Sequence, residues 1–512
     1  MAKVFQYDEV PSVQTKSGLI KGYAFDGVHI FKGIPYAQAR RFQMPTEVEP
    51  WEGVREATSY GFVSPLLKQD TPSVEIMIPH RYWPEDENCQ NLNIWTKSLD
   101  REAKRPVLVW FHGGGFVAGS AIEHIAYDGF NMCQYGDVVV VTVNHRLNIL
   151  GYLDLSFLGE KYYNSGNAGM ADLVAALKWI NANIEAFGGD PDNVTIFGQS
   201  GGGGKVTALM QIPEANGLFK RGIVMSGVFD SKMRPQRKGG GERIVTAMME
   251  ELNISMDEAE KLETIPYYFL AEAYNKVRPR VAEEGYYVGG SPLPNDYYLG
   301  EPLDKGYTEH AKTIPLMIGS VYAEFAFERL PFNKYELSDD EMEALVKEQY
   351  GERTGEVIEL FKKSYPDKKV VDLLSIDRLV RAPSKALARA HAKQGKAPAY
   401  LYNFTLDFPS YQHGKPAWHC ADIPFFFRNT DKVEICNIPG VSDRLEENIF
   451  RAVINFADNG DPNHSGLPHW PAVTPEVEPT MLFDATCTVR ENYDDDLLAL
   501  IEEILPPVKF GS

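Results

Sequence analysis

The chain has few cysteines, no long apolar run and a shortage of positive charge. Its 512 residues include 5 cysteines, and none of them forms a C-x-x-C pair. No H-E-x-x-H sequence occurs either, so a metal site has little support. No run of about 18 apolar residues is present, so no transmembrane helix is expected. The 51 basic and 71 acidic residues give a net charge of −20, and nucleic acid and anionic membranes are therefore not expected partners.

The length and the first residues set further bounds. A chain of 512 residues exceeds the usual size of one hydrophobic core, so lobes or insertions around a central core are expected. Residues 1–9 contain acidic side chains and no apolar h-region, which argues against a secretory signal peptide. The acidic run 494–496 is interpreted as a solvated surface patch.

The most informative segment places a serine between glycines after an apolar strand. Residues 194–197 read VTIF, and residues 198–202 read GQSGG with Ser200 at the centre. This is the layout of a nucleophile elbow, a tight strand-to-helix turn that exposes the serine hydroxyl. Glycines are needed on both sides because a Cβ there would collide with the neighbouring strand and helix. Residues 206–210 are predicted to continue the helix, and residues 190–193 to form a turn before the strand.

A second glycine-rich segment lies about ninety residues upstream. The apolar run 107–111 is predicted to be a short buried strand, and it leads into His112 followed by three glycines. A strand that ends in H-G-G-G is typical of the oxyanion-hole loop of esterases and lipases. Each motif alone is more often an ordinary glycine turn. Together, in this order, they favour a hydrolase.

The distribution of strands and helices predicts an α/β fold. Apolar strands are expected at 138–143, 223–225, 314–318, 399–404 and 481–483, with an amphipathic helix at 172–185. Strands that alternate with helices indicate a mostly parallel sheet with helices on both faces. Two helix-rich insertions, at about 230–307 and 330–395, contain capping boxes that begin at Ser255 and Ser338. We expect one domain over 1–512, with these insertions forming helical lobes around the active site.

The chain resembles the type-B carboxylesterases and lipases, which include cholinesterases and bacterial para-nitrobenzyl esterases. The resemblance covers nearly the whole chain and is not confined to the elbow. The other segments that carry it are 31–37 (FKGIPYA), 87–94 (ENCQNLNI), 144–147 (NHRL), 188–191 (GGDP) and 456–463 (FADNGDPN). The resemblance implies the α/β-hydrolase fold, a catalytic triad and no cofactor.

One departure from the family bears on location. Secreted members join the cysteine that corresponds to Cys89 to a second cysteine about twenty-five residues upstream, and Ser64 stands where that partner would be. The bridge is therefore absent, which fits a reducing cytoplasm. A bacterial intracellular protein is the simplest interpretation.

A serine nucleophile needs a base, and the chain order in α/β hydrolases is serine, acid, histidine. His419 lies in residues 417–425 (AWHCADIPF), which resemble the family's histidine loop. His413 is the reserve candidate. Asp422, in the same loop, is interpreted as a carboxylate that braces it.

The acid is expected on a loop after a strand between the serine and the histidine. Residues 314–320 resemble the family segment that precedes the acid, and the spacing from Gly319 places Glu324 at the acid position. Ala323 replaces the usual acidic neighbour and Phe325 replaces the glycine that normally follows. Glu328 is the alternative.

The resemblance also assigns the surroundings of the nucleophile. Gly114, Gly115 and Gly201 would donate three backbone N–H groups to an oxyanion. Gln199 stands where most relatives have glutamate, and Phe116 would line the substrate pocket. The cholinesterase tryptophan that binds cations through its ring is replaced by Pro79, although Trp83 lies nearby. Neutral esters are therefore favoured over choline esters.

These observations predict a serine carboxylesterase that acts through an acyl-serine intermediate. A small-molecule ester is the expected substrate, without cofactor or metal, and the protein is expected to be a monomer or a small homo-oligomer. The same residues would also serve on a carbamate, lactone, amide or polyester. A catalytically inactive binding module is the non-enzyme alternative, but such proteins usually lose the serine, which is present here.

Overall fold

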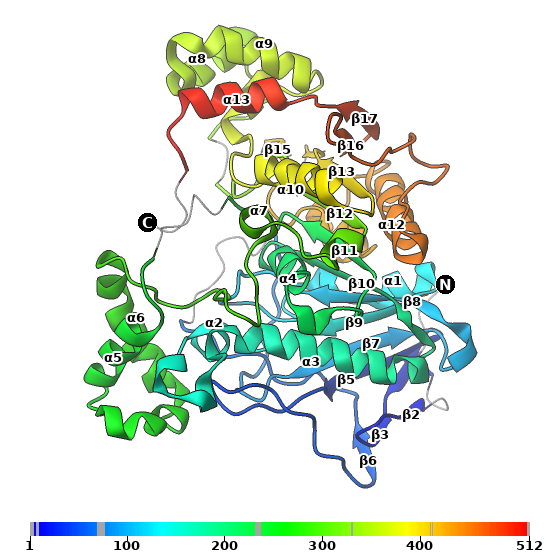
Figure 1. The fold of residues 1–512 in the computed structure, drawn as a ribbon. Helices are drawn as coiled ribbons and strands as arrows, with labels where there is room; N and C mark the ends of the chain where they lie inside the picture. Colours follow the sequence, from blue (N-terminus) through cyan, green and yellow to red (C-terminus); the bar gives the residue numbers. More distant parts are fainter. Residues whose placement is uncertain are drawn as a thin grey trace. The chain divides into compact units, whose positions relative to one another are not determined.

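The structure is a computed structural model that describes residues 5–6, 10–68, 77–230, 237–328, 331–409, 411 and 413–508. These residues fall into two compact units. The first unit holds the described residues within 1–73, 80–222 and 235–311, and the second holds those within 74–79, 223–234 and 312–512. Figure 1 follows the chain through both units in sequence colours.

The first unit is built on strands in the order β1-β4-β5-β7-β9-β8-β10. Their bounds are β1 Phe5–Gln6, β4 Tyr23–Phe25, β5 Val28–Pro35, β7 Asn91–Thr96, β8 Arg105–Phe111, β9 Val139–Val143 and β10 Gly189–Gln199. Strand β8 pairs in parallel with β9 and β10, whereas the pairs from β1 to β9 are antiparallel. A separate small sheet contains β2 (Ser12–Gln14), β3 (Leu19–Lys21) and β6 (Val54–Glu56).

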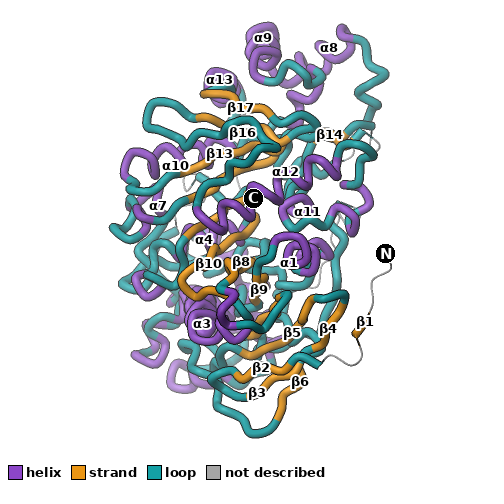
Figure 2. The backbone as a smooth tube through the Cα atoms, turned by 90° about the vertical axis from the view of Figure 1, so that its right-hand side faces the viewer, coloured by secondary structure: helices purple, strands orange, loops and turns teal. Residues whose placement is uncertain are grey.

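Helices cover both faces of these strands. Strand β9 reads VVVTV and is buried at every position, as expected for a strand covered on both sides. Figure 2 shows β8, β9 and β10 between helix α3 (Ala168–Asn183) and helix α1 (Phe130–Gly136). Helix α4 (Gly201–Leu209) follows β10 directly, and β11 (Arg221–Met225) follows α4.

The second unit carries strands in the order β12-β13-β16-β17. Their bounds are β12 Leu316–Val321, β13 Ala399–Phe404, β16 Pro479–Phe483 and β17 Thr488–Glu491. The first three are parallel and β17 is antiparallel to β16. In Figure 2, helix α10 (Arg381–Gln394) and helix α12 (Ser442–Asn459) lie on opposite sides of β13. Both units therefore show the layered α/β arrangement that the sequence predicts.

The two expected insertions each contribute helices to a separate apolar cluster. In the first unit, α5 (Glu242–Glu251) and α6 (Tyr267–Glu283) pack together through Ile244, Met248 and Leu270. In the second unit, α8 (Asp339–Tyr350), α9 (Thr354–Ser364) and α13 (Asp495–Ile504) share a cluster that includes Val346, Phe361 and Leu497. Both capping boxes form, but the one at Ser255 begins a 3-10 helix over Met256–Glu263. Shorter helices are α2 Asn148–Tyr152, α7 Pro302–Lys305 and α11 Ile423–Phe426.

Two local predictions are wrong. Residues 190–193 do not form a turn before the strand, because they already belong to β10, whose register against β8 shifts between Gly189 and Val194. Asp494 is not solvated, because its carboxylate is fully buried against the guanidinium of Arg381, with Nε and Oδ2 2.8 Å apart, and the ammonium of Lys385. A buried carboxylate of this kind is stable only when cations and hydrogen bonds replace its lost hydration.

No helix in the described part of the chain is both long and apolar enough to cross a bilayer.

Candidate active site

Ser200 occupies a strained turn between β10 and α4. Its φ of 56° and ψ of −126° lie outside the regions that side chains other than glycine ordinarily adopt. The flanking glycines make the turn possible, because a Cβ on Gly198 would lie 2.5 Å from the carbonyl carbon of Gly202, and a Cβ on Gly202 would lie 2.0 Å from the Phe111 oxygen. Strain of this kind is typical of functional sites, where the surrounding structure holds it in place.

The glycine loop after β8 lies against this turn. Gly114 and Gly115 have φ values of 78° and 64°, which glycine adopts without a steric penalty. A Cβ on Gly201 would lie 2.2 Å from the Gly115 oxygen, and one on Gly113 would lie 3.4 Å from the Ser200 Cβ. The loop therefore touches both the serine and the first residue of α4, where backbone N–H groups have no partner within the helix.

The two predicted pocket residues of the first unit flank the same loop. Gln199 is 1% exposed, and its Oε1 would lie 3.3 Å from a Cβ on Gly113. Phe116 is 7% exposed, and its ring packs edge-on against Tyr152 with centroids 5.3 Å apart.

A buried lysine beneath the loop was not anticipated from the sequence. Lys205 has no exposed surface, and its Nζ donates a hydrogen bond of 2.8 Å to the carbonyl oxygen of His112, where the glycine loop begins. Burial lowers the pKa of Lys205 to about 7, and loss of hydration raises the pKa of the nearby Glu123 to about 7. The signal available in the sequence was a lysine in a helix whose neighbouring residues are small or apolar.

The predicted acid and base come together in the second unit. Glu324 follows β12 and His419 lies on the loop after β13, and the segments are joined where the Ala323 N–H donates to the Ala417 oxygen at 2.8 Å. The Oε2 of Glu324 is hydrogen-bonded to Nδ1 of His419, and its Oε1 accepts from the N–H of Val321 at 2.9 Å. The Glu324 carboxylate is fully buried and the imidazole is 6% exposed.

The alternatives for the acid and the base, Glu328 and His413, are more exposed than Glu324 and His419. Glu328 is exposed, and its backbone oxygen accepts a hydrogen bond from Lys415 Nζ. His413 is half-buried with a φ of 65°. The acid–imidazole contact in this unit therefore involves Glu324 and His419. An imidazole whose Nδ1 faces a carboxylate is oriented to exchange a proton through Nε2.

Two more buried carboxyl groups lie near this pair. Asp422 is fully buried and accepts a hydrogen bond of 2.9 Å from the Tyr402 hydroxyl on its Oδ2. Burial raises the pKa of Asp422 to about 7. Burial also raises the pKa of Asp377 to about 7, and the charge of Glu324 adds to this effect. Asp377 accepts the backbone N–H groups of Leu379 and Val380. The raised pKa values of Asp422 and Asp377 favour their neutral forms relative to ordinary carboxyl groups, which limits the negative charge that is buried beside Glu324.

Asp422→Asn tests the protonation of this buried carboxyl. With a pKa near 7 in the fold against an ordinary 3.8, the native state holds more protons than the unfolded state between these values, so stability falls as pH rises through that range. Asparagine does not titrate. We therefore expect the free energy of unfolding of Asp422→Asn, relative to wild type, to increase between pH 5 and pH 8 by about 2.6 kcal/mol. Urea unfolding at both pH values measures this difference.

The matched control is Asp367→Asn, which removes an exposed carboxylate from the same unit. Its stability relative to wild type should be the same at pH 5 and pH 8. If the stability of Asp422→Asn relative to wild type is also the same at pH 5 and pH 8, Asp422 is ionised in the fold over this range.

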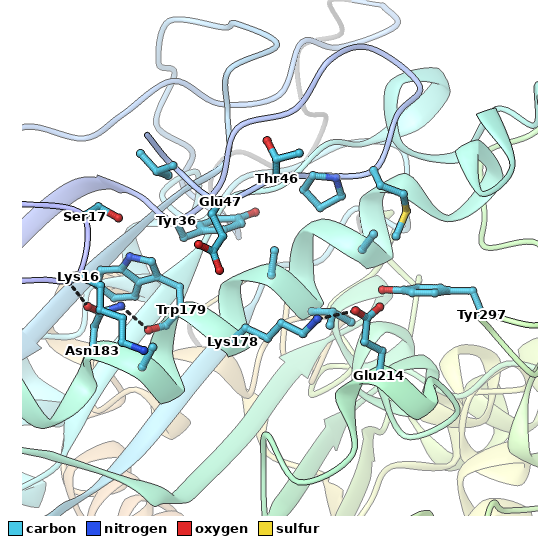
Figure 3. Close-up of a pocket in the computed structure, with 17 residues that line it drawn as sticks. Lys16, Ser17, Tyr36, Thr46, Glu47, Lys178, Trp179, Asn183, Glu214 and Tyr297 are labelled. Atoms are coloured by element: carbon cyan, nitrogen blue, oxygen red, sulfur yellow. Dashed lines mark hydrogen bonds and ion pairs between the residues drawn. The ribbon is translucent and has the colours of Figure 1, made fainter. Parts of the chain in front are cut away.

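A pocket lies in the first unit beside α3 (Figure 3). It has a volume of about 250 Å³ and is lined by α3 and the N-terminal segment, including Tyr36, Trp179 and an ion pair between Lys178 and Glu214. None of the predicted site residues lines it. Within the described ranges, no group of three or more histidine, cysteine or acidic side chains is placed to hold a metal ion.

Comparison with known proteins identifies the family. Residues 9–500 match the carboxylesterase family. The para-nitrobenzyl esterase of Bacillus subtilis (strain 168) is 33% identical over 497 residues, which cover 94% of this chain and 97% of the relative. Phenmedipham hydrolase of Pseudarthrobacter oxydans is 30% identical over 486 residues, which cover 90% of this chain and 92% of the relative.

Comparison with solved structures also identifies esterases. An esterase from anaerobic Clostridium hathewayi, described as able to hydrolyse aliphatic aromatic polyesters, is 56% identical with a TM-score of 0.96, and the match covers 98% of this chain and 100% of that one. A structure of PNB esterase is 30% identical with a TM-score of 0.77, covering 97% and 99%. The chain therefore belongs to the carboxylesterase family, and it is a carboxylic ester hydrolase with the α/β-hydrolase fold.

Proposed function

We propose that the protein hydrolyses neutral carboxylic esters through an acyl-serine intermediate, with Ser200 as nucleophile, His419 as general base and Glu324 as the acid that orients it. The observation that carries the proposal is the strained turn of Ser200, held against a loop of three glycines. The buried contact between Glu324 and His419 supports the other two assignments.

In the first step His419 accepts the hydroxyl proton of Ser200 while the oxygen attacks the ester carbonyl. The tetrahedral oxyanion accepts hydrogen bonds from the N–H groups of Gly114, Gly115 and Gly201, each of which is worth about 2.7–4 kcal/mol in such sites. The alcohol then leaves with the proton from His419. Water repeats the sequence on the acyl-serine, which releases the acid and restores Ser200.

The surroundings of the serine support a preference for neutral substrates. Gln199 places a neutral amide where most relatives carry a carboxylate, so no side-chain anion adjoins the nucleophile in the chain. Phe116 adds an apolar ring beside the glycine loop.

We also propose that the two helical insertions form lobes around the active site. We also propose a cytoplasmic location in a bacterium. The five free thiols support a reducing compartment, and the similarity to bacterial esterases supports the source.

The preference can be measured with a pair of esters of equal size. We expect kcat/KM for 3,3-dimethylbutyl acetate to exceed that for acetylcholine by about tenfold, because the ammonium group loses hydration in the site and gains no anionic partner there. A penalty of about 1.4 kcal/mol in the transition state gives this factor. Gln199→Glu places a carboxylate beside the nucleophile and should bring the ratio of the two kcat/KM values toward one. Assays at two ionic strengths control for attraction by the net charge of −20. A wild-type enzyme that prefers acetylcholine would contradict the substrate proposal and point to another cation site, such as Trp83.

Polyesters are a second candidate substrate class. The 56% identity and TM-score of 0.96 to the polyester-hydrolysing esterase favour it. An assay of the soluble acid released from an aliphatic–aromatic polyester film, with the Ser200→Ala variant as the blank, separates this candidate from activity restricted to small esters.

A further inference from the structure

The residue that follows the proposed acid has an unusual backbone conformation. Phe325 has a φ of 47°, in the left-handed region that a bulky side chain rarely adopts. Glycine would occupy the same conformation without strain. The strain is therefore not a requirement of the turn. It follows from the presence of a phenylalanine in this turn.

The phenylalanine ring lies on the face of the proposed catalytic base. The rings of Phe325 and His419 are stacked, with centroids 4.2 Å apart and planes inclined by 27°. Phe327 approaches the same imidazole edge-on, with centroids 6.4 Å apart. The ring centroids of Phe229 and Phe327 each lie 6.2 Å from that of Phe325. All of these residues belong to the second unit.

Two consecutive side chains thus contact a single imidazole. Glu324 bonds to Nδ1 at the edge of the ring, and Phe325 covers its face. In an extended chain, neighbouring side chains point in opposite directions. The positive φ of Phe325 departs from that geometry, and in this conformation both groups reach His419. The strained conformation and the stacked ring are therefore parts of one arrangement.

Packing of the apolar core does not account for the ring. Phe325 and its two phenylalanine neighbours, Phe229 and Phe327, are all partly exposed, whereas the residues of the core cluster in this unit that includes Ala323 are buried. A partly exposed ring contributes less to stability than a buried one. An orienting role at the histidine explains both the position of the ring and the presence of a phenylalanine in a strained turn.

We propose that Phe325 is a positioning residue, which fixes the plane of the His419 imidazole by stacking while Glu324 fixes its rotation. This rests on the proposed function of His419 as the base. A carboxylate contact at one atom leaves the ring able to tilt about the hydrogen bond, and contact across its face removes that freedom. The proton-accepting nitrogen is then held in one direction, as efficient proton transfer requires.

Three substitutions at Phe325 separate this role from a structural one. Phe325→Tyr keeps the stacked ring and should retain at least half of the wild-type kcat. Phe325→Leu keeps an apolar side chain without a ring face and should lower kcat by about tenfold with KM unchanged, since misplacement of a catalytic group by a fraction of an ångström has effects of this order. Phe325→Gly should lower kcat at least as much, yet its urea midpoint should equal or exceed that of wild type because glycine relieves the strain.

Tyr135→Leu is the matched control, because it removes an exposed aromatic ring from α1 in the other unit, outside both insertions. Its kcat and KM should equal those of wild type. Wild-type kcat in both Phe325→Leu and Phe325→Gly overturns the proposal, as does an equal loss in Phe325→Tyr and Phe325→Leu. A raised KM with unchanged kcat would also overturn it, by making the ring a substrate contact.

Comparison with Ser200→Ala distinguishes a failure of the positioning proposal from a failure of the proposed function. If Ser200→Ala is inactive and Phe325→Leu is fully active, the acyl-serine proposal stands and the positioning role is rejected. If Ser200→Ala remains active, the proposed function itself fails. Should Phe325→Gly not fold, the comparison of Phe325→Leu with Phe325→Tyr still decides the question.

Discussion

Replacing Ser200 with alanine is expected to lower kcat for p-nitrophenyl acetate by about 10⁴-fold or more, because the variant lacks the atom that attacks the ester. The fold should be retained. Alanine keeps the Cβ that already occupies the strained turn at a φ of 56°, and it removes only a hydroxyl group. Initial rates, referred to the concentration of folded enzyme, measure the loss.

Ser200→Gly is the matched variant for the strain itself. It should be equally inactive, but its free energy of unfolding should rise by about 1 kcal/mol, because glycine adopts this conformation without the cost that other residues incur. Covalent labelling provides an independent check: a fluorophosphonate should add its mass to the peptide that contains Ser200 in the wild type and in neither variant. A tenth of the wild-type kcat remaining in Ser200→Ala would end the acyl-serine proposal.

The sequence predicted the buried strands more accurately than the helices. Strand β9 was expected at 138–143 and is found at Val139–Val143, and β13 matches its predicted range of 399–404. Such strands are recognisable because every position is apolar or β-branched and turn residues bound them. Helix α3 begins at Ala168, four residues before its predicted start. Its first residues are small and apolar and provide no capping signal, so tertiary contacts decide where the helix begins.

For the site, the sequence predicted the features that depend on neighbouring residues and missed or left open those that depend on residues distant in the chain. The turn at Ser200 and the glycine loop were recognisable because each depends on a few adjacent residues. The contact of Glu324 with His419 joins residues 95 positions apart, and spacing alone left Glu328 open as the acid. Lys205 was missed because its hydrogen-bond partner, the oxygen of His112, is 93 positions away.

Asp494 shows why charge patterns are an unsafe guide to burial. Three consecutive aspartates favour a solvated surface, yet the first of them is buried against Arg381 and Lys385, which lie 113 and 109 positions away in the sequence. The desolvation of a carboxylate is offset here by two cations on α10. Nothing local to residues 494–496 indicates that partnership, because it exists only after α10 and the start of α13 have packed.

Replacing His419 with alanine is expected to lower kcat by about 10⁴-fold or more, close to the loss in Ser200→Ala, because a serine hydroxyl without a base remains protonated and a poor nucleophile. The two residues act as a unit, so the double variant should be hardly less active than either single variant. Added imidazole should restore part of the activity of His419→Ala and none of the activity of Ser200→Ala, since it replaces a base and not a nucleophile.

The control is His413→Asn on the same loop. His413 has a φ of 65°, which asparagine tolerates better than most residues, so the loop should keep its shape and kcat should change by no more than about twofold, the scale expected for a side chain outside the proton transfer. A large loss in His413→Asn with activity retained in His419→Ala would transfer the role of base to His413. The buried contact of Glu324 with His419 would then need another explanation, because a carboxylate against an imidazole in a nearly dry site is the arrangement that stabilises the imidazolium formed when the serine proton is taken.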